Sequence, residues 1–153
     1  AVEVSGTAMS NTLKNIKKDK LVELPVAEEM QMGMTLGLAM DKNVPISIFP
    51  RWNFLLYGIT PLVNHIDKFK IMAGSDIVPK LIIRTGIGSE RPLHPQHQHI
   101  GDFSISIQKM CTSIEVIKLN SSKDIFPAYK KAYERKDGKN TIIVEYGDYY
   151  NEK

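Results

Sequence analysis

The chain has 153 residues, of which 42% are hydrophobic and 24% charged, and it carries a net charge of +3. These values are typical of one globular domain and exclude a disordered chain, and the charge is too small to indicate nucleic acid as a partner. The single cysteine, Cys111, excludes an intramolecular disulfide and fits a reducing compartment. No run approaches the roughly 18 apolar residues of a membrane helix, and no signal segment precedes the first motif. We therefore expect a cytoplasmic protein with no membrane partner.

Short β-rich runs alternate with amphipathic runs, which predicts an α/β fold with a three-layer, doubly wound and mainly parallel sheet of about six strands. The predicted strands and extended runs, in chain order, are Val2–Ser5, Leu21–Leu24, Val44–Phe49, Leu81–Arg84, Ile114–Leu119 and Thr141–Tyr146. The predicted helices are Ser10–Lys18, Ala27–Met40, Asn53–Ala73, Ser104–Met110 and Ser121–Arg135. Because proline lacks the backbone N–H, we expect Pro61 to kink or break the longest helix.

Two segments have a composition that needs a further explanation. Gly33 and Gly37 lie four residues apart, hence on one face of a predicted helix, where each costs roughly 1 kcal/mol relative to alanine. A closely approaching helix, strand or ligand is the usual compensation for such a cost. The loop over residues 86–101 is long and rich in Gly, Pro, His and Gln. Long ordered loops in compact domains are often functional.

Three segments, in this order, resemble one enzyme family. Pro25–Met40 has a proline, a small residue and a glutamate before a glycine-punctuated helix. Pro45–Phe54 has a strand followed by aromatic-Asn-Phe, and Gly88–His97 is a loop ending in Gln-His. Together they resemble the pyrimidine-binding domain of thiamine-diphosphate-dependent enzymes, a flavodoxin-like α/β fold. The sequence is most similar to the beta subunit of the 2-oxo acid (pyruvate) dehydrogenase first component, and at a greater distance to transketolase and deoxyxylulose-phosphate synthase.

This resemblance implies roles for four residues. Glu28 matches the catalytic and cofactor-binding glutamate, which bonds the aminopyrimidine nitrogen of thiamine diphosphate and favours its imino form. Phe54 matches the aromatic residue that stacks on the aminopyrimidine, and Trp52 is a second candidate for the same wall. His97 matches the active-site histidine, which contacts the substrate or intermediate. An imidazole there can donate a hydrogen bond to a developing oxyanion or move a proton.

Structural roles compete with these interpretations. Glu28 and Glu29 both suit the first turn of a helix, where acids interact favourably with the helix dipole. Adjacent helical residues point about 100° apart, so we do not expect both to face one ligand. Phe54 also suits the core, at the start of an amphipathic helix. The H-x-x-H-x-H spacing from His94 to His99 could chelate zinc, but no cysteine or HExxH helix accompanies it, so we predict no metal site.

The resemblance also implies a partner. The family binds the diphosphate through Mg²⁺ at a Gly-Asp-Gly plus Asn motif in a separate domain, and Gly101-Asp102-Phe103 and Tyr146-Gly147-Asp148 are not that motif. We therefore expect a partner subunit that holds the diphosphate and its Mg²⁺, together with self-association of this chain. Residues 1–153 are expected to form a single pyrimidine-binding domain, truncated at its N-terminus and without a C-terminal transketolase-type domain.

The resulting hypothesis is a subunit of a thiamine-diphosphate-dependent enzyme that acts on a 2-oxo acid or a ketose and is inactive alone. The alternative is a non-catalytic regulatory or scaffolding α/β module that keeps the fold without the chemistry. A flavodoxin-like module that binds a nucleotide is weaker, because no phosphate-cradling glycine loop follows the first strand.

Overall fold

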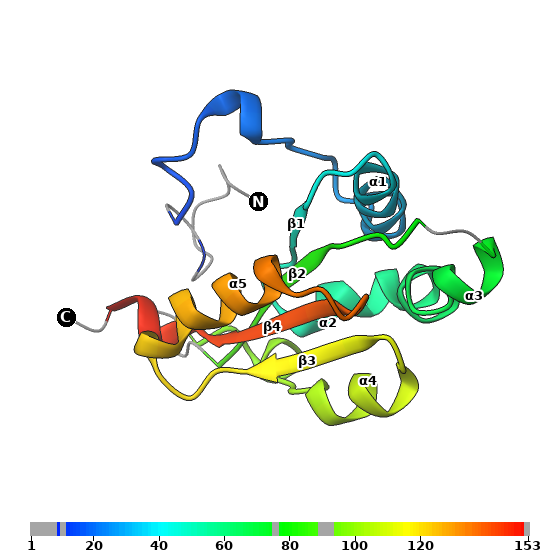
Figure 1. Ribbon diagram of the computed structural model, residues 1–153. Helices are drawn as coiled ribbons and strands as arrows, with labels where there is room; N and C mark the ends of the chain where they lie inside the picture. The colour runs from blue at the N-terminus through cyan, green and yellow to red at the C-terminus, as the bar shows by residue number, and fades with distance from the viewer. Residues whose placement is uncertain (1–8, 10–11, 75–76, 89–93, 152–153) are drawn as a thin grey trace.

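A computed structural model describes residues 9, 12–74, 77–88 and 94–151, and it contains a parallel sheet of four strands. The strands are β1 (Ile46–Ile48), β2 (Ile82–Ile87), β3 (Ile114–Lys118) and β4 (Asn140–Tyr146). Their spatial order is β1-β2-β4-β3, and every neighbouring pair is parallel (Figure 1). The predicted α/β fold with a parallel sheet is therefore confirmed.

Four of the six predicted strands correspond to strands of this sheet, and a fifth is contradicted by the structure. Val2–Ser5 lies outside the described residues. Leu21–Leu24 pairs with no strand within the described part of the chain, and Val22 is 64% exposed. A strand there would bury little apolar surface, so nothing offsets the entropy of ordering it.

Among the described residues, five α-helices connect or flank the strands. In chain order they are α1 (Glu28–Met40), α2 (Trp52–Leu55), α3 (Phe69–Ala73), α4 (Ser104–Met110) and α5 (Ile125–Glu134). None of the helices in the described residues is long and apolar enough to cross a membrane.

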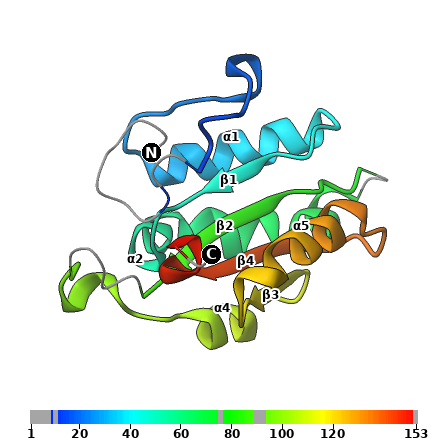
Figure 2. The same ribbon diagram turned by 90° about the vertical axis from the view of Figure 1, so that its left-hand side faces the viewer.

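The helices cover both faces of the sheet, as the two views of Figures 1 and 2 show. Met32 of α1 and Ile107 of α4 belong to the larger core cluster, which includes Ile83 of β2. On the opposite face, Ala132 of α5 packs in a second cluster with Ile82. Because β2 is covered on both sides, all its residues are buried, including the polar Arg84 and Thr85.

The longest predicted helix, Asn53–Ala73, is broken into short pieces. After α2 come a 3₁₀ turn, η2 (Leu56–Gly58), a π-helical turn, η3 (Pro61–Ile66), and finally α3. The break at Pro61 confirms the expectation from its missing N–H.

The predicted helix Ser10–Lys18 is wrong for the described residues. Thr12–Asn15 forms turns, and only the short 3₁₀ turn η1 (Lys18–Lys20) follows. Its lysine-rich sequence offers two apolar side chains, of which Ile16 is 45% exposed. That is too little packing to repay the nucleation of a short helix.

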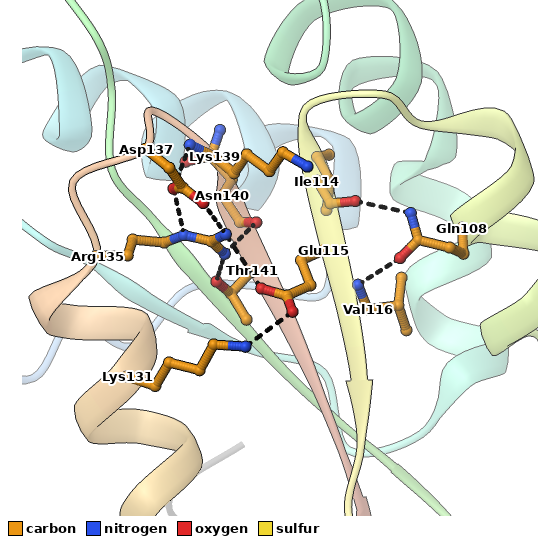
Figure 3. A network of polar contacts seen from close by, with 10 residues as sticks. All are labelled: Gln108, Ile114, Glu115, Val116, Lys131, Arg135, Asp137, Lys139, Asn140 and Thr141. Atoms are coloured by element: carbon orange, nitrogen blue, oxygen red, sulfur yellow. Dashed lines mark hydrogen bonds and ion pairs between the residues drawn. The ribbon is translucent and has the colours of Figure 1, made fainter.

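Polar contacts secure the edge of the sheet at β3 (Figure 3). The Gln108 side chain donates to the carbonyl of Ile114 and accepts from the N–H of Val116, so its amide replaces a missing neighbouring strand. Arg135, after α5, pairs with Glu115 of β3 at 3.0 Å and with Asp137 at 2.7 Å. This network lies where β3 and β4 begin, so it joins α5 to the amino ends of the strands.

Asp67, between η3 and α3, has a fully buried side chain. Its carboxylate accepts hydrogen bonds from the backbone N–H groups of Thr112 at 2.8 Å and Ser113 at 2.6 Å, and lies 2.7 Å from the Lys68 ammonium. Burial alone would raise the pKa of Asp67, but Lys68 and the hydrogen bonds from Ser113 and Thr112 outweigh it and hold that pKa below its usual value. Asp67 thus fastens the turn before β3 to the helices under the sheet.

We predict that Asp67→Asn lowers the free energy of unfolding by about 2 kcal/mol at pH 7, because an amide cannot accept all these hydrogen bonds. Since the folded-state pKa is lowered, the stabilisation is present above the unfolded pKa of about 4 and is lost as the pH falls below it. Urea denaturation between pH 2 and pH 7 would show that the free energy of unfolding falls less with decreasing pH in the variant than in the wild type. Asp41→Asn, at an exposed site, is the control, and an equally reduced pH dependence there would contradict the assignment.

Candidate functional site

The candidate site lies beyond the carboxyl ends of β1 and β2. α2 begins four residues after β1 ends, and the segment that contains the histidines follows β2. Because β1 and β2 are parallel neighbours, these two connections emerge at the same edge of the sheet. Ligands of open α/β sheets commonly bind at this edge.

The first turn of α1 reaches the same edge because α1 runs back to the start of β1. Gln31 donates from Nε2 to the carbonyl of Ile48 at 3.0 Å and to the Ser47 hydroxyl at 2.9 Å, near the end of β1. Gly58 of η2 lies against the same turn: a Cβ on Gly58 would come within 2.8 Å of Met32 Cγ and 3.4 Å of the Glu28 carbonyl. Glu28 is therefore next to the turn that follows Phe54.

Glu28 is half-buried, whereas Glu29 is exposed. Within the described residues, the Glu28 carboxylate makes no hydrogen bond or ion pair, and no side chain caps α1. The first-turn position fits the helix-dipole interpretation for both acids. Only Glu28 also lies on the side that packs against η2, which favours it over Glu29 as a ligand contact.

Phe54 is partly buried and packs against the larger core cluster. The ring of His99 lies against it, with centroids 5.6 Å apart and planes 27° from parallel. His99 Nδ1 lies 3.1 Å from Asn53 Oδ1, and Gln98 Nε2 lies 3.2 Å from His99 Nε2. These contacts fit the neutral tautomer in which Nδ1–H donates to Asn53 and Nε2 accepts from Gln98. Asn53 and Phe54, which end the family-like segment Pro45–Phe54, therefore orient the His99 ring.

His97 is exposed, and its ring lies 5.9 Å from that of His94 at 66°. Trp52 is 1% exposed and belongs to the core cluster, so the protein already covers its ring. Within the described ranges no three His, Cys, Asp or Glu side chains come together as a metal site.

Cys111 is buried, and burial raises the pKa of its thiol to about 11. The nearby Asp67 carboxylate contributes to the same rise. The thiol therefore stays protonated near neutral pH and is not a nucleophile of this site.

The sequence motifs predict Glu28 and Phe54 as site residues, but they do not single out His99, Asn53 or Arg51. The guanidinium of Arg51 contacts the carbonyls of Gly88 and His99. These contacts join residues that are far apart in the chain, which no local pattern indicates. The Arg-Trp-Asn-Phe run after a strand was the available signal, because three of its residues turn out to touch His99.

A comparison with family models matches residues 2–150 to the transketolase, pyrimidine binding domain. The chain belongs to this family. The match confirms the thiamine-diphosphate family to which the three sequence segments point, and this family binds that cofactor. A search of curated proteins finds no match. The geometry fits a pyrimidine-binding domain, because the first turn of α1, which begins with the half-buried Glu28, rests on the turn that follows the partly buried Phe54.

We predict that Gly58→Ala destabilises the domain by about 1–3 kcal/mol, because the methyl group collides with Met32 and forces α1 away from η2. Urea denaturation measures this change. Gly37→Ala is the matched control: its Cβ would meet nothing within 4 Å, so removing a helical glycine should stabilise α1 by up to about 1 kcal/mol. Equal effects of the two substitutions would show that α1 does not dock on Gly58.

Proposed function

We propose that the chain is the pyrimidine-binding subunit of a thiamine-diphosphate-dependent enzyme that acts on a 2-oxo acid or a ketose, most similar to a dehydrogenase beta subunit. The observation that carries the proposal is the half-buried Glu28 carboxylate, unpartnered among the described residues, beside the turn that follows Phe54. Family membership supports the cofactor, and the site supports the residues that meet it.

The bound cofactor would supply a stabilised carbanion for bond cleavage next to a carbonyl group. Glu28 would hold a proton at the ring nitrogen of the aminopyrimidine, and the Phe54 ring would fix the plane of that heterocycle. The protein's contribution in this proposal is orientation and proton placement.

His97 keeps the role that the resemblance implies as a proposal, but the geometry favours His99 for the ring nearest the cofactor. His99 contacts Phe54 and is oriented by Asn53, whereas His97 is exposed beside His94. An oriented neutral imidazole is suited to donate a hydrogen bond or transfer a proton to a reacting oxygen.

A partner subunit completes the site in this proposal, since the sequence contains no Gly-Asp-Gly motif for Mg²⁺ and the diphosphate. The exposed face of α1 supports a protein contact there. Met30, Met34 and Leu38 are 39–42% exposed on one side of the helix, and a Cβ on Gly33 or Gly37 would meet nothing within 4 Å. Glu28 lies on the other, packed side of α1, in line with Met32 and Thr35, so a diphosphate-binding partner on the exposed face would hold the helix in place beside the cofactor, and self-association would use further surface.

The non-catalytic alternative is favoured by one observation. The His99 ring already lies against Phe54, so a cofactor ring on the same side of Phe54 would have to displace it. A regulatory or scaffolding module would have no need to open this contact.

We expect no saturable binding when the isolated chain is titrated with thiamine diphosphate and Mg²⁺ by calorimetry, because the diphosphate carries most of the ligand's charge and has no site here. Adding the diphosphate-binding subunit should produce binding. Tight binding by the chain alone would overturn the two-subunit proposal.

In the reconstituted complex, Glu28→Gln should reduce turnover by about 100-fold or more, since the amide cannot exchange a proton with the aminopyrimidine. Glu29→Gln is the matched control, because it removes the same first-turn charge from an exposed neighbour. If both variants lose activity equally, Glu28 acts through the helix dipole; if neither does, the non-catalytic module is the better description.

A further inference from the structure

Arg51, just before α2, connects the two ends of the segment that contains the histidines. One of its terminal guanidinium nitrogens, Nη1, donates to the carbonyl of Gly88 at 2.7 Å and to that of His99 at 3.3 Å. Gly88 directly follows β2, and His99 ends the 3₁₀ turn η4 (His97–His99). A single cation therefore joins the carbonyl of Gly88 to that of His99.

The Gly88 end of this clamp is fixed in place. Gly88 has φ +64°, and a Cβ there would come within 1.8 Å of the Tyr146 ring. Only glycine suits both the conformation and the space. Gly88 directly follows Ile87, which pairs with Tyr146 in the sheet, and Arg51 ties the His99 carbonyl to that of Gly88.

Arg51, Asn53 and Phe54 contact His99 in three different ways. Arg51 binds its carbonyl, Asn53 its Nδ1 and Phe54 the face of its ring. The three residues lie at the start of one short helix, so they move as a unit. Together they fix the position, the rotation and the tautomer of the imidazole.

Burying part of the Arg51 guanidinium costs free energy that an apolar side chain in the same place would not. The side chain is half-buried, burial lowers its pKa, and no carboxylate pairs with it in the described part of the chain. A guanidinium still stays charged in proteins, and among the described residues the carbonyls of Gly88 and His99 are the groups that accept its hydrogen bonds. An apolar side chain of the same length would avoid that cost but could not hold two carbonyls.

We infer that Arg51 is a positioning residue that holds His99 against Phe54 by tying the His99 carbonyl to that of Gly88. Its importance for catalysis rests on the proposed function, whereas its effect on the imidazole is a property of the free chain. Loss of the clamp releases His99 while Glu28 and α1 stay in place.

The test is nitrogen-15 NMR of the histidine side chains in the full chain without cofactor. Wild-type His99 should show a protonated Nδ1 and ring contacts to Phe54 in nuclear Overhauser spectra. In Arg51→Met both signatures should be lost, and Arg51→Lys, which can still donate to a carbonyl, should restore them in part. Arg135→Met is the matched control: it removes a half-buried arginine at the opposite ends of the strands, and His99 should be unchanged.

Unchanged His99 signals in folded Arg51→Met would overturn the inference. If that variant does not fold, the wild-type spectrum decides: Arg51 guanidinium protons must show contacts to the backbone of Gly88 and His99, and their absence would refute the clamp. Failure of the proposed function looks different, because Arg51→Met would still change His99 while Glu28→Gln left the reconstituted complex unaffected.

Discussion

The close approach of α1 to η2 at Gly58 determines where the candidate site lies. A side chain at residue 58 would meet Met32 and the Glu28 carbonyl, so the absence of one allows the first turn of α1 to rest on the turn after Phe54. Gln31 fixes the same turn along its axis by bonding the end of β1. Helix packing therefore brings the first turn of α1, which begins with Glu28, and the turn after Phe54 to one edge of the sheet.

This arrangement requires the carboxyl ends of the strands to stay in register. Arg84 of β2 and Glu145 of β4 form a buried ion pair, with Nη2 2.9 Å from the carboxylate, and Arg84 also donates to the hydroxyl of Thr12. A one-residue slip would turn Glu145 toward the apolar cluster on the other face. Leaving one of these charges unpaired would cost about 3–5 kcal/mol, so the pair selects one register even if it adds little net stability. Because β2 pairs with both β4 and β1, the same register also fixes the ends of β1 and β2, from which the site is built.

Local pattern was sufficient for the strands in the core and for the existence of α1, but the close neighbour expected at Gly33 and Gly37 is absent from the described residues, since a Cβ on either would meet nothing within 4 Å. Local pattern failed for Ser10–Lys18, where a helical pattern had no surface to pack on. The break of the longest helix was predictable from Pro61, but not the π-helical turn that follows it. In the site, Glu28 and Phe54 come from sequence motifs, whereas the contacts of Arg51 with Gly88 and of His99 with Asn53 depend on the pairing of β1 with β2. No single segment contains that information.

Glu28 and the exposed face of α1 belong to one helix, and this has a consequence for how the proposed assembly would work. α1 begins without a side-chain cap, and its apolar face and its acidic first turn lie within the same three turns. A partner that covers Met34 and Leu38 would restrict the motion of the helix and hence of the carboxylate at its start. By linkage, a ligand held at Glu28 would then strengthen the contact with the partner by the same factor as the partner strengthens ligand binding. In such an enzyme, assembly and cofactor binding are one coupled equilibrium, because both act on the position of α1.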